Sequence, residues 1–159
     1  MINPSDLMEQ LEALSLASRL RRVSDRMVDD VAALYNELNI DFNPRWFPYF
    51  YVLKEGEPYA VNDLATLLRV SHPTVIKFTN QMVKEGLLTS KTDTKDRRRR
   101  LLTMTSKGQA LADKMMPVWA KVRDAVNEAV KESGFALFEG LNQFDNALDR
   151  SSIEQRYSS

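Results

Sequence analysis

The sequence predicts a mainly α-helical protein that contains one small β-hairpin. Apolar residues recur every three or four positions over most of the 159 residues, which is the period of a helix with one buried face. Between Leu87 and Thr105 this pattern gives way to two short strand-like runs, residues 88–91 and 100–104, with polar residues between them. The hydrophobic content of 43% and the length indicate one folded domain, or two small lobes that share a core.

A long helix is predicted over residues 6–38. Its apolar positions step by three or four from Leu7 to Leu38, and Asp6 with Glu9 forms a capping-box pattern at its start. A helix of this length projects beyond a small core, so part of its apolar stripe is expected to pack on another chain. Residues 1–40 are therefore predicted to be an N-terminal dimerisation helix.

The middle of the chain is predicted to hold short elements that are separated by proline, asparagine and glycine. They are, in order, a helix over residues 45–55, an extended piece over residues 59–61, a helix over residues 63–69 capped by Asn62, and a helix over residues 72–85 capped by Ser71 and closed by Gly86.

Two helices are predicted after the hairpin, over residues 107–132 and 138–150, and Ser106 is expected to cap the first. Phe138, Leu141 and Phe144 give the last helix an apolar face. Residues 106–150 are therefore predicted to be C-terminal dimerisation helices, and the polar residues 151–159 a flexible tail.

The net charge is zero but the charges are segregated along the chain. Residues 1–68 carry a net charge of −5, residues 69–107 carry +7 and residues 108–159 carry −2. A basic block between acidic flanks indicates a surface that meets a polyanion, although a solvated run of charges would give the same count. The motifs within the block have to decide between these two interpretations.

Several classes of protein are disfavoured by composition. The chain has no cysteine, which excludes disulfides and thiol chemistry, and His72 is its only histidine, which makes a zinc site improbable. There is no apolar run of about 20 residues and no signal peptide at the N-terminus, so a cytoplasmic location without a membrane partner is expected. With no recognisable catalytic pair or cofactor loop, we expect neither an enzyme nor a cofactor.

Residues 64–75 have the pattern of a short helix, a tight turn and the start of a second helix. On the second helix Val75, Phe78 and Met82 are expected to point inward. The polar tip of the hairpin follows, with four consecutive arginines, Arg97 to Arg100. Residues 41–105 are thus predicted to be a winged helix-turn-helix, in which the second helix enters the major groove of DNA and the wing reaches phosphates and the minor groove.

This arrangement predicts two sets of DNA-contacting residues, one on the helix and one on the wing. Ile76 is also on the outer face of the same helix, where its apolar side chain is expected either to meet a thymine methyl group or to weaken the anchoring to phosphates. The candidate residues are Ser71, His72, Pro73, Thr74, Lys77, Asn80 and Gln81 on the helix, and Lys95, Asp96, Arg97, Arg98 and Arg99 on the wing.

Four motifs together resemble the MarR (multiple antibiotic resistance regulator) family of bacterial transcription factors, and the resemblance extends over nearly the whole chain. The motifs are Val70-Ser-x-x-Thr-Val75, Gly86-Leu-Leu, Asp93-x-Lys-Asp-Arg-Arg98 and Leu102-Thr-Met-Thr-Ser-Lys-Gly108. The resemblance implies a homodimer joined by its terminal helices, with Arg98 in the minor groove and Asp96 holding it. Lys95 stands where family members often have arginine, which keeps the charge but loses the planar fork.

Seven of the 14 aromatic residues lie within residues 42–59, and two interpretations of this cluster stay open. The rings fill the core of the winged domain, or some of them form the wall of a pocket for an aromatic or lipophilic ligand. The candidate ligand-binding residues are Trp46, Phe47, Phe50, Met115 and Trp119.

Two classes of function follow. The first is a homodimeric regulator, expected to be a repressor, that binds a pseudo-palindromic operator in double-stranded DNA and is released by a small-molecule effector. The second is a winged-helix module that binds protein or a ligand without an operator. The four consecutive arginines favour the first, because a protein-binding module has no need for them.

Overall fold

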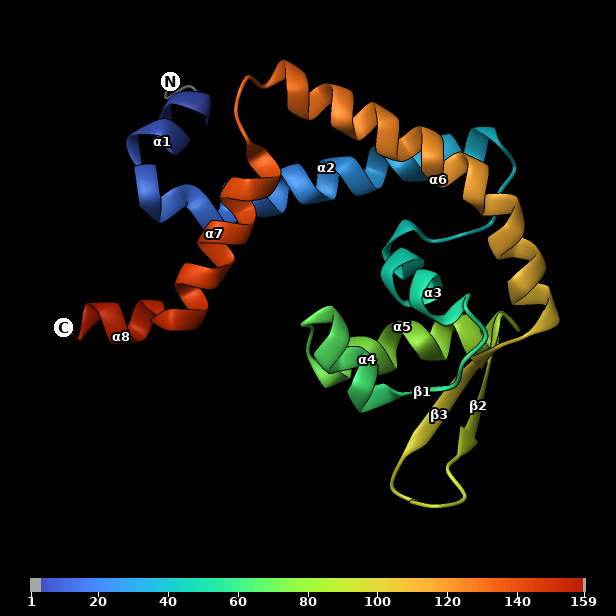
Figure 1. Cartoon of the computed structure of the whole chain (residues 1–159). Coiled ribbons are helices and arrows are strands. Elements are labelled where there is room, and N and C mark those ends of the chain that lie inside the picture. Colours follow the sequence, from blue (N-terminus) through green and yellow to red (C-terminus); the bar gives the residue numbers. More distant parts are fainter. Residues whose placement is uncertain (1–3, 159) are drawn as a thin grey trace. The chain divides into compact units, whose positions relative to one another are not determined.

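The computed structural model describes residues 4–158, which form a mainly helical chain with one small sheet (Figure 1). The chain divides into two compact units, residues 1–114 and residues 115–159. The first unit holds the N-terminal helices and the winged part, and the second holds most of helix α6 and all of α7 and α8.

The predicted single helix over residues 6–38 is wrong, because the structure interrupts it. The observed elements are α1 (Pro4–Gln10), the 3-10 helix η1 (Glu12–Ser15) and α2 (Leu16–Glu37). The Ser15 hydroxyl donates hydrogen bonds to the carbonyls of Met8, at 2.7 Å, and Glu12, at 2.9 Å, and Glu12 has a φ of 42°. A left-handed residue and a hydroxyl that competes for backbone carbonyls both end an α-helix. Helix α1 also begins two residues before Asp6, so Asp6 is not its cap.

The winged part contains the elements that the sequence predicts, with one difference: a 3-10 helix and a separate α-helix that ends at Leu53 replace the single helix predicted over residues 45–55. The observed elements follow in chain order. They are the 3-10 helix η2 (Pro44–Trp46), α3 (Phe47–Leu53), β1 (Tyr59–Ala60), α4 (Val61–Leu68), α5 (His72–Lys84), β2 (Leu88–Thr92) and β3 (Arg100–Met104). The strands form one antiparallel sheet in the order β1-β3-β2, with Leu88 opposite Met104 and Thr92 opposite Arg100. The predicted winged helix-turn-helix is therefore confirmed.

One cap in this part differs from the prediction. Helix α4 begins at Val61, so its N-cap is Ala60 and Asn62 lies inside the helix. Ala60 leaves β1 in an extended conformation and Val61 is buried, which turns the chain into the helix two residues early. The predicted cap of α5, Ser71, is observed in an extended conformation directly before His72.

The core of the first unit lies where α3, α4 and α5 meet the sheet. Its members are apolar side chains with almost no exposed area, contributed by all four of these parts. They include Phe50, Leu53, Leu64, Val75, Met82, Leu88 and Leu102.

The chain closes with α6 (Ser106–Glu132), α7 (Leu137–Arg150) and α8 (Ile153–Tyr157). Thr105, and not Ser106, caps α6, because its hydroxyl oxygen accepts the Gly108 N–H at 3.0 Å. The segment predicted to be a flexible tail contains α8, which starts with a capping box between Ser152 and Gln155. The sequence analysis missed this helix although Ser-x-x-Gln is a start signal.

Two helices present apolar side chains to the surface of their own unit. On α2 these are Leu16, Leu20, Val23 and Met27, and on α7 they are Phe138, Leu141 and Phe144. Helix α7 has no buried residue at all. Between residues 4 and 158, no helix combines the length and the apolarity that crossing a bilayer requires.

Candidate nucleic-acid interface

The turn between α4 and α5 sets the direction of the second helix. Arg69 ends α4 in a left-handed conformation with a φ of 53°, and the Val70 N–H then donates to the carbonyl of Ala65 at 3.1 Å. The Ser71 carbonyl accepts the N–H groups of Thr74 and Val75 and so opens α5. These local hydrogen bonds explain why a short stretch of sequence was sufficient to predict the turn.

Helix α5 is fixed through one completely buried face. Val75, Thr79 and Met82 have no exposed area. Burial of Thr79 was not predicted; its hydroxyl donates to the Val75 carbonyl at 2.8 Å, which satisfies the polar group inside the core. Phe78, predicted to point inward, is half-buried and packs on the Tyr49 ring at 5.6 Å between centroids.

The opposite face of α5 presents most of the predicted DNA-contacting side chains. Ser71, His72, Pro73, Lys77, Asn80 and Gln81 are exposed, and Thr74 and Ile76 are half-buried. The hydroxyls of Ser71 and Thr74 lie 2.7 Å apart in a hydrogen bond, which orients both at the start of the helix. The Lys77 ammonium lies 5.4 Å from the centre of the Phe78 ring.

Gln81 has a partner in the protein that the sequence did not indicate. Its side-chain oxygen accepts the indole N–H of Trp46 at 2.9 Å. The two residues are 35 positions apart, so no local pattern could have paired them.

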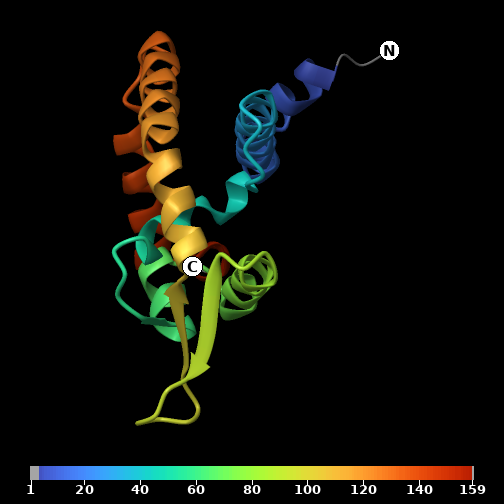
Figure 2. The same cartoon turned by 90° about the vertical axis from the view of Figure 1, so that its right-hand side faces the viewer.

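The wing tip, residues 93–99, joins β2 to β3 and projects away from α5 (Figure 2). Two aspartates shape it through the backbone. Asp93 accepts the Lys95 N–H at 2.8 Å, and Asp96 accepts the Arg98 N–H at 3.0 Å. The Asp96 carboxylate also lies 3.5 Å from the Arg98 Nε, in an ion pair. The Arg98 side chain is 94% exposed, so the aspartate contacts only the Nε of the guanidinium and leaves the rest of that group in solvent.

The arginines of the tip are not equivalent. Arg99 pairs with Asp63 of α4 at 2.7 Å, and Arg100 donates to the hydroxyl of Ser90 across the hairpin. Arg97 and Arg98 are exposed. Arg99 therefore has a structural partner that the sequence analysis did not foresee, because Asp63 lies 36 positions away.

The structure brings the start of α5 and the C-terminal side of the wing, Arg98 to Arg100, together around one hollow of about 360 Å³. Its lining includes His72 and Ile76 from α5 and Arg98 to Arg100 from the wing, with Ala60, Val61 and Asn62 from β1 and α4. The two parts of the predicted DNA-contacting set lie more than 20 residues apart in sequence, yet they share one surface.

The candidate ligand-binding residues are divided between the two units. Trp46 and Phe50 are buried and both pack edge-on against Phe42, with centroid distances of 5.6 and 5.0 Å. Phe47 is 38% exposed and lies against Tyr51. Met115 and Trp119 are buried residues of α6 in the second unit. Core packing accounts for Trp46 and Phe50, while a ligand pocket stays a prediction.

Within residues 4–158, no cluster of His, Asp and Glu side chains could hold a metal ion. His72 is exposed on the outer face of α5.

Comparison with known proteins agrees with this geometry. Residues 47–99 match the model of the MarR family, which covers α3 to the end of the wing tip. In sequence, no curated protein matches the chain.

Solved structures share the fold along most of the chain. The MepR–DNA complex of S. aureus has a TM-score of 0.63 at 17% identity, covering 86% of this chain and 96% of that one. The transcriptional repressor CouR bound to a 23-mer DNA duplex has a TM-score of 0.65 at 23% identity, covering 85% and 96%. The transcriptional regulator BldR from Sulfolobus solfataricus has a TM-score of 0.57 at 24% identity, covering 92% and 99%.

Proposed function

From the MarR-family domain at residues 47–99, we propose that the protein is a transcriptional regulator that binds double-stranded DNA sequence-specifically. The observation that carries the proposal is the shared hollow, around which the start of α5 and the arginines of the wing lie together. A helix start aimed at base edges and a basic loop aimed at phosphates are the two parts of winged-helix recognition. MepR and CouR, whose solved complexes contain DNA, have the same fold.

In this proposal the two parts have different tasks. Thr74 and Lys77 stand on a helix held by the core, and they contact bases and neighbouring phosphates in the major groove. Arg97 and Arg98 carry exposed guanidinium groups and contact phosphates or a narrow minor groove. Arg99 contributes mainly by holding the wing to α4 through Asp63.

The working form is a homodimer. Exposed apolar side chains recur every three or four residues along α2 and α7, and a second copy would cover them. Two copies would place their recognition helices about 34 Å apart, one turn of DNA, on a pseudo-palindromic operator. In this proposal the protein acts in the cytoplasm as a repressor and not as an enzyme. Binding of a small aromatic effector releases the protein from its operator.

The second function, a winged-helix module for protein binding, needs no exposed arginine pair. Arg97 and Arg98 pointing into solvent beside a recognition helix favour DNA.

The test is selection of duplexes from a random pool by the purified protein, followed by sequencing. Enrichment of a pseudo-palindrome with half-sites 10–11 base pairs apart is expected. Sedimentation should show a species of twice the chain mass of 18.3 kDa. A pool without enrichment at low salt would refute sequence-specific binding, and a species of 18.3 kDa alone at micromolar concentration would refute the dimer.

A further inference from the structure

The short 3-10 helix η2 lies between two elements with different predicted tasks. It contacts α2, the helix with the exposed apolar stripe, and it contacts α5, the recognition helix. All three elements belong to the first unit. Each of the last two residues of η2 makes a polar bond to one of these helices.

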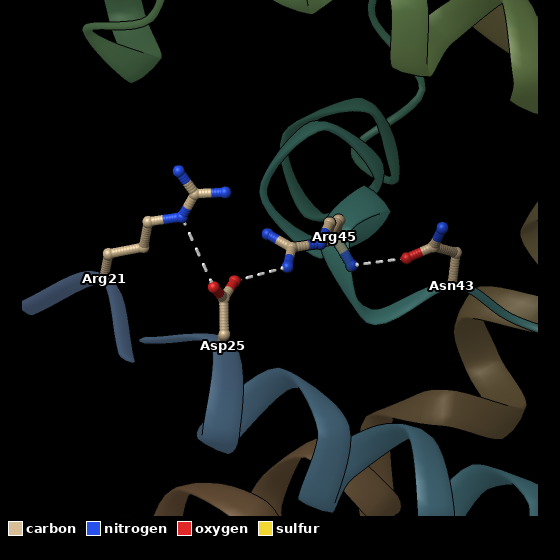
Figure 3. A network of polar contacts seen from close by, with 4 residues as sticks. All are labelled: Arg21, Asp25, Asn43 and Arg45. Carbon is tan, nitrogen blue, oxygen red and sulfur yellow. Dashed lines mark hydrogen bonds and ion pairs between the residues drawn. The ribbon is translucent and has the colours of Figure 1, made fainter. Parts of the chain in front are cut away.

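Arg45 makes the bond to α2. Its guanidinium donates to the Asp25 carboxylate at 2.7 Å, and the Arg45 N–H donates to the Asn43 side chain at 2.9 Å (Figure 3). Asn43 thereby caps η2 and fixes its start. The hydrogen bond from Arg45 lowers the pKa of Asp25 below its usual value.

Trp46 makes the bond to α5. Its indole N–H donates to the Gln81 side-chain oxygen at 2.9 Å, and the ring is only 8% exposed. A buried indole with a satisfied N–H has one preferred position, so it holds η2 against the last turn of α5, where Gln81 lies.

A chain of aromatic rings runs beside the two polar bonds. Tyr35 at the end of α2 packs edge-on against Phe42, at 6.0 Å, and Phe42 packs against Trp46, at 5.6 Å. Tyr35 and Phe42 are both buried. Helix α2 is thus joined to η2 directly at Asp25 and, through the Phe42 ring, also at Tyr35.

We propose that η2 sets the position of the recognition helix relative to α2, and that Arg45 and Trp46 thereby determine which half-site spacing the protein accepts. The inference rests on the proposed function, because spacing has a meaning only for a dimer on DNA. If α2 is held by the second copy, a fixed angle between α2 and α5 fixes the separation of the two recognition helices. Arg45 and Trp46 would then act as positioning residues that touch no base.

The proposal predicts a specific defect. One inserted base pair moves a half-site by about 3.4 Å along the axis and rotates it by about 35°. If the contacts of η2 hold α5 rigidly relative to α2, the wild-type protein loses much of its affinity for such an operator. If these contacts are weakened, α5 can follow the displaced half-site, and the loss of affinity is smaller.

The experiment uses operators selected by the full-length wild-type chain, with one base pair inserted or deleted at the centre, and a single half-site duplex. The variants are Arg45→Gln, Trp46→Phe and their combination. Arg21→Gln is the matched control, because Arg21 pairs with the same Asp25, at 3.6 Å, but this ion pair lies within α2 and links it to no other element. Far-ultraviolet circular dichroism and a thermal melt establish that each variant is folded.

The expected result is a smaller spacing penalty with an unchanged half-site affinity. Each single variant should reduce the ratio between the affinities for native and altered spacing by about two- to fivefold, which is the effect expected for one partly exposed polar pair. The combination should reduce this ratio by about tenfold. Arg21→Gln should keep the wild-type ratio.

Two failures are distinguishable. If the wild-type chain selects an operator and shows a spacing penalty that Arg45→Gln, Trp46→Phe and the combination leave unchanged, the inference is wrong and the proposed function stands. If the wild-type chain enriches no duplex, the proposed function is wrong, and so is the inference that rests on it. Equal loss on half-sites and on all spacings would also overturn the inference, because that result indicates damage to α5 itself.

Discussion

Helix α5 and the wing tip both present side chains predicted to meet DNA, but the protein holds them in different ways. Three residues of α5, Val75, Thr79 and Met82, have no exposed area, whereas every residue of the tip is exposed or half-exposed. The tip keeps its shape through two aspartate turns, two backbone bonds and the pair between Arg99 and Asp63.

The difference indicates what each part can recognise. Buried packing fixes the position of a helix well enough for hydrogen bonds to individual base edges, whose geometry is narrow. An exposed loop has no buried packing to hold such geometry, but its exposed arginines can place positive charge near phosphates. We therefore expect sequence discrimination from α5 and sequence-independent affinity from the tip.

The largest effect is expected at the base of the wing, where α6 starts. A Cβ on Gly108 would lie 2.3 Å from the carbonyl oxygen of Leu87 and 2.7 Å from the Met104 side chain. Because the closest atom is backbone and already accepts the Thr105 N–H, Gly108→Ala should lower the free energy of unfolding by about 3 kcal/mol. Urea denaturation measures this.

Gly140→Ala is the matched control for that variant. Gly140 also lies inside a helix, α7, but a Cβ there would meet nothing within 4 Å. Alanine has the higher helix propensity, so this change should stabilise the protein by up to about 1 kcal/mol. Equal behaviour of the two alanine variants would contradict a close approach of α6 to the wing.

Thr74→Ala should weaken binding to the selected operator by about 1–3 kcal/mol, through the loss of one base contact, and leave random duplexes nearly unaffected. Thr74→Ser keeps the hydroxyl that bonds to Ser71 and should retain most of the affinity. Fluorescence anisotropy on both duplexes checks this. A similar loss on operator and random DNA would show that Thr74 contacts a phosphate and not a base.

Arg98→Ala should weaken binding to operator and random duplex alike, and reduce the salt slope by about one phosphate contact. Arg123→Ala is the control, since it removes the same charge from an exposed position on α6. Its salt slope should stay at the wild-type value. A selective loss on the operator alone would assign base recognition to the wing.

Asp96→Ala is expected to have the smallest effect, about 0.2–1 kcal/mol, and its sign is informative. Removal of a negative charge near DNA favours binding. Loss of the hydrogen bond from the Arg98 N–H disorders the tip, which weakens DNA binding. We expect weaker binding. Asp96→Asn keeps an acceptor for that N–H, so it should bind at least as tightly as wild type; tighter binding by Asp96→Ala would exclude an orienting role.

Local patterns in the sequence were sufficient for the elements of the winged part. Ser71 before α5 and Gly86, with a φ of 71°, after it act on the residues next to them. The two strands of the hairpin are neighbours in the chain and were predicted from their own residue pattern. The interruption before α2 was missed because a single hydroxyl, that of Ser15, competes with an otherwise continuous helical period.

The long-range partners could not be predicted for a different reason. The pairs Trp46–Gln81 and Arg99–Asp63 join residues 35 and 36 positions apart, and their existence depends on how the elements pack. The sequence placed Gln81 and Arg99 correctly on the exposed side of their elements, but their partners follow only from the folded arrangement. Burial of Thr79 was missed although its partner is local: the bond from its hydroxyl to the Val75 carbonyl, four residues earlier, satisfies the polar group inside the core.

The division between α5 and the wing tip is tested most directly by one set of titrations. The affinities of wild type, Thr74→Ala and Arg98→Ala are measured on the selected operator and on a random duplex across a salt series. We predict that Thr74→Ala lowers the operator-to-random ratio at an unchanged salt slope, and that Arg98→Ala lowers the slope by about 0.9 at an unchanged ratio. An unchanged affinity and slope in Arg98→Ala would contradict wing contact with DNA and would favour the protein-binding module.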